Sequence, residues 1–214
     1  MHNIALISTS HQEHGKCNSG ELLIIFEKIK PDVIFEEMPA LRFNDFYVTG
    51  TESSLGSKAI IAYSQNHTVE HVPVDNCIIP KIDMKKIDSV FRTIGRKNPE
   101  YASMTENNYT MTFQHGFRYL NSLECGNHFT KIKLLEMQTL LKLKDRKLLE
   151  LYGQYYDIQN ERVNAMLNEI YDYYKIHKFN NAVFLAGAAH RSFILQKIES
   201  MKSSDYGIKW LQQF

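Results

Sequence analysis

Four apolar segments of the sequence are each followed by side chains that bind metals or carry protons. His11 follows the segment Ile4–Ile7, and His190 follows Ala182–Leu185. Carboxylates follow the other two segments: Glu36, Glu37 and Asp75. Imidazole nitrogens and carboxylate oxygens suit Mn, Co or Zn, and an open coordination position turns a bound water into a nucleophile near neutral pH. The pattern predicts a divalent metal site with five candidate ligands: His11, Glu36, Glu37, Asp75 and His190.

The same residue types predict hydrolysis of an amide or ester. Neighbouring strand residues point in opposite directions, so one glutamate of the pair is expected to face the site, with Glu37 preferred and Glu36 second. Glu37 is expected to act as a ligand or general base, and Asp75 to orient a histidine. Arg162 is expected near a helix start, where an exposed salt bridge is the ordinary role and a fork for a substrate carboxylate or a clamp on a glutamate is the alternative. In the hydrolase hypothesis it would stabilise developing negative charge. The candidate catalytic residues are His11, Glu37, Arg162 and His190.

Other reaction classes lack their sequence motifs. The phosphate-binding patterns GxxxxGK[ST] and GxGxxG and the serine-nucleophile pattern GxSxG do not occur. The run His11–His14 is neither HExxH nor HxxEH, and His14 is expected at the rim of the site. A nucleophile and base pair of Cys17 with His11 is a minor alternative. The small residues Gly187–Ala189 are expected to allow close approach of the backbone to a neighbouring strand or ligand.

The apolar segments themselves predict the sheet that positions these residues. Ile4–Ile7, Val33–Phe35 and Ala182–Leu185 are short and rich in β-branched or aromatic residues, which is typical of buried parallel strands. Thr68–Val74 is a weaker candidate, and the alternating Ile208–Leu211 is expected at an edge. Ligands of parallel sheets bind beyond the carboxyl ends of the strands, so the residues named above are expected at one edge.

Helical patterns separate these strands. Gly20–Lys30 has apolar residues at helical spacing and ends before Pro31, and residues 53–66 form a second candidate. A further helix is expected over Arg191–Met201. The alternation predicts an α/β fold with a largely parallel central sheet flanked by helices.

A long stretch without strand patterns interrupts this alternation. Residues from about 84 to 178 carry amphipathic patterns, best seen in Thr130–Leu151 and Asn160–Tyr174. We expect one α/β domain over 1–214 with a helical insertion at about 84–178. Six tyrosines in this region are expected at a helix interface, with an aromatic wall facing substrate as the alternative: Tyr152, Tyr155, Tyr156, Tyr171, Tyr173 and Tyr174.

Composition narrows the cellular setting and the partners. The 214 residues are 43% hydrophobic and 23% charged, with a net charge of +1, so disorder and strongly basic nucleic-acid binding are disfavoured. The basic run Lys142–Lys147 is expected to be a solvated helix face. Three widely spaced cysteines with no CxxC pair, no signal peptide and no 20-residue apolar run predict a cytoplasmic protein outside the membrane. The expected partner is a small-molecule or peptide substrate, and a homo-oligomer is left open.

At these positions the sequence resembles the superfamily that groups the TraB/PrgY, Tiki/GumN, ChaN-like and erythromycin-esterase-like proteins. The similarity lies in an ordered set of motifs: Ser8–His11, Gly20–Glu21, Lys30–Glu37, Val72–Asp75, Asn160–Met166 and Val183–His190. The last is a full GxxH after an apolar strand, and in the first Ser8 stands where the family has glycine. The set spans nearly the whole chain.

The resemblance implies an α/β core with two motif histidines and a glutamate at its centre. For Tiki-like members it also implies metal-dependent proteolysis, which points again to His11, Glu37 or Glu36, and His190, with Asp75 and Arg162 in support. Other members are linked to ester cleavage, haem binding or peptide pheromone handling. The preferred hypothesis is a metal-dependent hydrolase, and the alternative is a non-catalytic protein that binds a peptide or haem in the same crevice.

Overall fold

A sheet of five parallel strands forms the centre of the computed structural model, which describes residues 2–76, 83–201 and 207–212. The strands lie in the order β3-β2-β4-β1-β5. Their bounds are β1 (His2–Thr9), β2 (Val33–Glu36), β3 (Glu70–Pro73), β4 (Asn181–Gly187) and β5 (Ile208–Leu211). The predicted α/β fold with a parallel central sheet is confirmed, and Ile208–Leu211 is an edge strand as expected.

Seven helices and three short helical turns surround or extend this sheet among the described residues. The helices are α1 (Ser19–Ile29), α2 (Leu55–Ser64), α3 (Met84–Lys97), α4 (Pro99–Leu120), α5 (Leu123–Leu143), α6 (Arg146–Ile176) and α7 (Arg191–Met201). The turns cover Ala40–Arg42, Asn44–Val48 and Ala188–His190. Within residues 2–76, 83–201 and 207–212, every helix is too short or too polar to pass through a bilayer.

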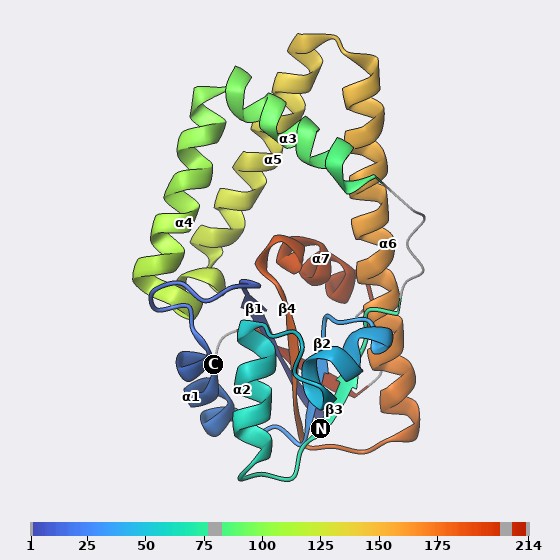
Figure 1. The fold of residues 1–214 in the computed structure, drawn as a ribbon. Coiled ribbons are helices and arrows are strands. Elements are labelled where there is room, and N and C mark those ends of the chain that lie inside the picture. Colours follow the sequence, from blue (N-terminus) through green and yellow to red (C-terminus); the bar gives the residue numbers. More distant parts are fainter. Residues whose placement is uncertain (1, 77–82, 202–206, 213–214) are drawn as a thin grey trace.

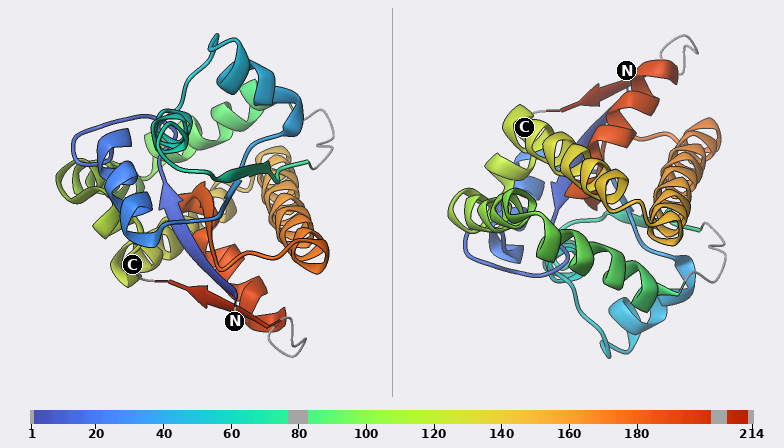
Figure 2. Two further views of the ribbon diagram at one scale, coloured as in Figure 1. Left: turned by 90° about the horizontal axis from the view of Figure 1, so that it is seen from below. Right: turned by 90° about the horizontal axis from the view of Figure 1, so that it is seen from above.

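Alternate residues of the strands bury opposite faces of the sheet. Ala5 and Ile7 of β1 pack with α1 and α2, whereas Ile4 and Leu6 pack with α6 and α7. Helices therefore cover both faces, with α1 and α2 on one side and α6 and α7 on the other (Figure 2). Strands buried on both faces explain the continuous apolar runs in the sequence.

Between β3 and β4, the described residues form α3, α4, α5 and α6, which extend beyond the carboxyl ends of the strands (Figure 1). The amphipathic pattern predicted over Thr130–Leu151 belongs to two helices, because the chain turns at Lys144 with a left-handed φ of 54°. Asp145 then caps α6 by accepting hydrogen bonds from Lys147 N and Leu148 N. The helical layer thus lies where a ligand-binding crevice of a parallel sheet is expected.

Candidate functional site

Glu37 is the centre of a polar cluster at the carboxyl ends of β2 and β4. Its Oε2 accepts a hydrogen bond of 2.7 Å from the backbone N–H of Gly187, and its Oε1 lies 2.9 Å from Arg162 Nη2. His190 Nε2 lies 3.1 Å from the same Oε1. The side chain of Glu37 is only 5% exposed. The structure therefore brings together three of the four predicted catalytic residues, Glu37, Arg162 and His190.

Arg162 joins Glu37 to a second buried carboxylate. Its Nη2 and Nε lie 2.7 Å and 3.2 Å from Asp75 Oδ2, and its Nη1 donates to Gln159 Oε1 at 2.7 Å. Asp75 therefore pairs with an arginine, not with a histidine as expected. Arg162 also lies in the middle of α6, not near a helix start. Among the roles expected for Arg162, these contacts match that of a clamp on a glutamate.

The contacts of Glu37 strongly favour its ionised form. Burial raises the pKa of this carboxyl, but hydrogen bonds from His190 and Gly187 and the charges of His190 and Arg162 outweigh burial and lower it to about 2. A carboxylate with so low a pKa is a weak proton acceptor at neutral pH. Glu37 is therefore better suited to orienting His190 than to acting as the general base.

Glu36 belongs to a separate cluster on the other face of β2. Its Oε2 accepts hydrogen bonds from the Tyr47 hydroxyl at 2.7 Å and from His71 Nε2 at 2.9 Å. Its Oε1 lies 3.1 Å from where a Cβ on Gly56 of α2 would stand. The alternation of strand side chains separates the two glutamates, as the sequence predicted, and Glu37 is the one that meets His190.

Gly187 leaves a small space that three functional side chains surround. A Cβ at this position would lie 3.4 Å from Glu37 Oε2, 3.6 Å from His190 Cδ2 and 3.9 Å from His11 Nε2. His11, Glu36, Glu37 and Gly187 also line a hollow of about 100 Å³. The histidines that follow β1 and β4 therefore approach one point from two sides, and the absence of a side chain on Gly187 keeps that point open.

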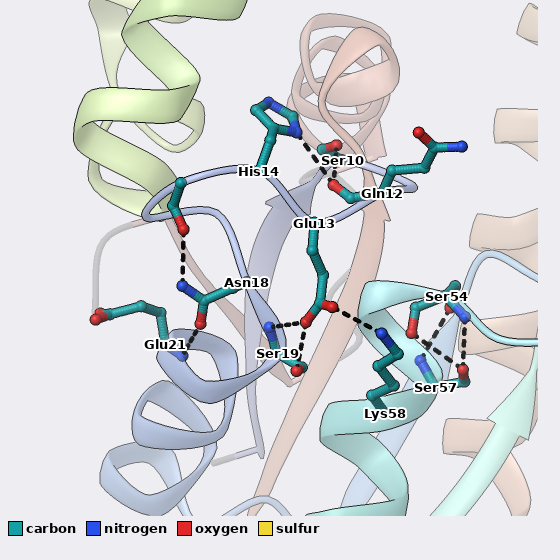
Figure 3. A network of polar contacts seen from close by, with 11 residues as sticks. Ser10, Gln12, Glu13, His14, Asn18, Ser19, Glu21, Ser54, Ser57 and Lys58 are labelled. Carbon is teal, nitrogen blue, oxygen red and sulfur yellow. Dashed lines mark hydrogen bonds and ion pairs between the residues drawn. The ribbon is translucent and has the colours of Figure 1, made fainter.

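The loop that carries His11 is held by polar contacts of Glu13, which was not among the predicted site residues. Glu13 Oε1 accepts hydrogen bonds from Ser19 N at 2.9 Å and Ser19 Oγ at 2.5 Å, and Lys58 Nζ lies 2.7 Å from Oε2 (Figure 3). The hydrogen bond from Lys58, together with those from Ser19, lowers the pKa of Glu13 to about 2. These contacts connect the loop to α1 and α2 and restrict where His11 can lie.

Arg191 ties the ends of β1 and β4 together and was also missed. It directly follows His190, is 6% exposed, and donates from Nη1 to Leu6 O and Ser8 Oγ, each at 3.2 Å. Ser8, the first residue of the motif that ends in His11, thus has a structural contact. β1 and β4 pair directly as far as Thr9 and Gly187, and Arg191 adds side-chain hydrogen bonds to β1 beside the strand ends from which His11 and His190 extend.

His14 and Cys17 lie outside the cluster around Glu37. The His14 ring stacks on Tyr109 with centroids 4.8 Å apart. Cys17 is buried in the apolar core, and burial raises the pKa of its thiol to about 11. A thiol that resists ionisation is a poor nucleophile, so the Cys17 and His11 alternative is disfavoured. Cys77 lies outside the described residues.

The predicted metal ligands do not form a coordination group as the side chains lie. Among the described residues, no three or more His, Cys, Asp or Glu side chains are arranged to hold a metal ion. Both oxygens of Glu37 accept hydrogen bonds, and Arg162 occupies the space between Glu37 and Asp75. The donor set of this conformation therefore fits a network of proton donors and acceptors better than a metal centre.

A larger cavity of about 430 Å³ lies elsewhere, where α1 and α4 meet, and none of the predicted site residues is among those that line it.

No protein-family model, curated protein or solved structure matches this chain. The function is therefore argued from the chemistry of the site.

Proposed function

We propose that the protein is a hydrolase that cleaves an amide or ester bond of a small-molecule or peptide substrate. The observation that carries this proposal is the approach of His11, Glu37 and His190 to one open point beside Gly187. Two imidazoles and an orienting carboxylate are the groups that general acid and base catalysis requires. The resemblance of the two histidine motifs to the TraB and Tiki superfamily supports the same reaction class.

His190 is the proposed general base. In this proposal Nε2, which lies 3.1 Å from Glu37 Oε1, carries the proton that holds the ring, and Nδ1 is assigned the lone pair that accepts a proton. Water then attacks the substrate carbonyl, the new C–O bond forms, and the proton of the water passes to His190. The ionised state of Glu37 stabilises the imidazolium that results.

His11 is the proposed general acid. It is exposed on its loop, so its ring exchanges protons with solvent, and Nε2 lies toward the space beside Gly187. When the C–N or C–O bond of the tetrahedral intermediate breaks, protonated His11 supplies the proton of the amine or alcohol that leaves. His190 then returns its proton to solvent, and His11 takes one up.

Arg162 and Asp75 act as positioning residues in this scheme. The guanidinium donates to Glu37, Asp75 and Gln159, so its donors are already engaged. Its proposed role is to keep Glu37 ionised and in contact with His190. A role for Arg162 in directly stabilising the charge of the intermediate is therefore not part of the mechanism.

The experiment compares wild type with His11→Ala and His190→Ala on chromogenic esters and a peptide library, with His14→Ala as the matched control from the same loop. Each site variant is expected to lose at least about a hundredfold in kcat/KM, as is usual for general acid or base groups. His14→Ala is expected to keep its activity. Hydrolysis that survives the double variant, or its absence from wild type on the whole panel, would contradict the proposal.

A requirement for Mn, Co or Zn stays a prediction from the sequence. Metal analysis of protein purified without a histidine tag tests it, and His11→Ala with His190→Ala is the control. A stoichiometric metal that is lost in the double variant would favour metal-dependent hydrolysis over the scheme above. The proposed cytoplasmic setting is supported by Cys17 and Cys125, which are both free thiols.

The alternative function is non-catalytic binding of a small ligand in the crevice. It is favoured by a further cavity beside His190, called the second cavity below. It measures about 220 Å³ and is lined by His190 together with several aromatic residues. A compound that copurifies with wild type and is unchanged after incubation would support binding without turnover.

A further inference from the structure

The second cavity lies in the helical layer directly beside the candidate site. His190 and Gln159, the latter an acceptor for Arg162, both line it. Much of its wall is aromatic: Phe91, Tyr101, Phe129, Tyr155, Tyr156 and Phe193. Its volume of about 220 Å³ is below the ~300–1,000 Å³ of pockets that enclose drug-sized ligands. The cavity therefore suits one small apolar or aromatic group.

Lys133 of α5 contributes a positive charge to this aromatic wall. Its Nζ lies 3.8 Å from the centroid of the Phe193 ring and 5.3 Å from that of Tyr156. Phe193 is one helical turn beyond His190, so the ammonium lies on the side of the cavity that borders the site. Within the part of the chain that the structure describes, Lys133 forms no ion pair at contact distance, and the acidic group whose charge acts on it is Glu136; Lys131 on the same helix pairs with Glu100 at 2.9 Å.

Glu136, the acidic residue of the cavity, has its own partners. Its Oε2 accepts hydrogen bonds from the hydroxyls of Tyr152 at 3.0 Å and Tyr156 at 2.8 Å. Burial raises the pKa of Glu136, which shifts this carboxyl toward its neutral form, and burial lowers the pKa of Lys133. An anion beside Lys133 would offset the cost of burying its charge.

We infer that this cavity binds a small apolar or aromatic group that carries a free carboxylate, and that Lys133 recognises the carboxylate. A single carboxylate matches the single ammonium of Lys133. This inference rests on the proposed function, because it takes the carboxylate-bearing group to be part of a substrate whose scissile bond lies at His190. The C-terminal residue of a peptide has this chemistry.

Calorimetric titration of the untreated protein tests the inference without turnover. The probes share one aromatic body and differ in charge: hydrocinnamate, its neutral amide hydrocinnamamide, and the cationic phenylpropylamine. Hydrocinnamate is expected to bind at least about tenfold tighter than the amide, because a charge-assisted hydrogen bond to Lys133 is lost in the amide. Equal binding of acid and amide, tighter binding of the amine, or no binding of any probe at millimolar concentration would overturn the inference.

Variants then assign the effect to Lys133. Lys133→Gln is expected to weaken hydrocinnamate binding at least about tenfold and the amide little, and Lys133→Arg to retain the preference for the acid. Lys142→Gln, an exposed site on the same helix, is the matched control. Unchanged preference in a folded Lys133→Gln, checked by circular dichroism, would overturn the assignment. His11 is not among the residues that line the cavity, so loss of hydrolysis with retained hydrocinnamate binding in His11→Ala separates the two proposals.

Discussion

Arg162 and Glu37 form an ion pair of 2.9 Å between residues 125 positions apart in the sequence. Arg162 comes from the middle of α6, and Glu37 directly follows β2. The same guanidinium neutralises Asp75, so one cation serves two buried carboxylates. The charge balance of the site therefore depends on how α6 packs against the sheet.

Replacing Arg162 should destabilise the fold. Arg162→Met leaves buried Asp75 without its charged partner and Glu37 with His190 alone, which is expected to cost about 3–5 kcal/mol in the free energy of unfolding. Arg162→Lys keeps the charge but loses the bidentate geometry, so an intermediate loss is expected. Urea denaturation measures both. The control, Arg146→Gln, removes an exposed pair with Glu150 and should cost less than ~1 kcal/mol. Similar losses of unfolding free energy in Arg162→Met and Arg146→Gln would contradict the prediction that Arg162 stabilises the fold through its buried ion pairs.

The low pKa of Glu37 predicts a specific loss of stability in acid. Its folded pKa of about 2 lies below the ordinary value of 4.5, so the stabilisation is complete above about pH 4.5 and disappears as the pH falls toward 2. The free energy of unfolding of wild type minus that of Glu37→Gln should shrink over this window by up to about 3 kcal/mol. A difference that stays constant with pH would show that Glu37 is not held ionised by its neighbours.

Gly187→Ala should remove activity while leaving the fold intact. The added methyl group would lie at ordinary contact distances of 3.4 to 3.9 Å from Glu37, His190 and His11, and the φ of −60° suits alanine. It would occupy the space in which the substrate carbonyl or water is proposed to react, so kcat/KM is expected to fall at least about tenfold. Thermal denaturation checks the fold. Gly153→Ala in α6, where a Cβ meets nothing within 4 Å, is the matched control and should keep full activity.

Glu13→Gln should impair the site through the position of His11. The loss of the Lys58 ion pair loosens the loop, and a severalfold fall in kcat is expected, with under ~1 kcal/mol lost in stability because the pair is partly exposed. In a His11→Ala background the same change should have no further effect. Asp172→Asn, which removes an exposed pair with Lys175, is the control. An equal effect of Glu13→Gln with and without His11 would show that Glu13 does not act through His11.

The sequence predicted the sheet and the acidic and histidine residues at its edge because both depend on local patterns. Buried parallel strands are continuous apolar runs, and the residues that follow them meet at one edge of the sheet. This rule alone predicts that Glu37 and His190 lie close together, as they do. The alternation of strand side chains also separated Glu36 from Glu37.

The rest depends on contacts that local patterns do not encode. The break at Lys144 has neither glycine nor proline to mark it, so two helices had the periodicity of one. Arg162 consequently lies far from the helix start expected for it. Lys133 and Glu136 belong to no sequence motif. Their neighbours come from α6 and α7, and only the packing of α5 against these helices places Lys133 and Glu136 in the cavity that His190 also lines.

The 31-residue helix α6 carries Tyr156 and, less than two turns further on, Arg162. A helix of this length is a stiff rod of about 45 Å, so movement at one level is transmitted to the other. Tyr156 lines the aromatic cavity and Arg162 holds Glu37, so this one helix contributes to both. The position of α6 therefore affects both the shape of the cavity and the alignment of Glu37 with His190.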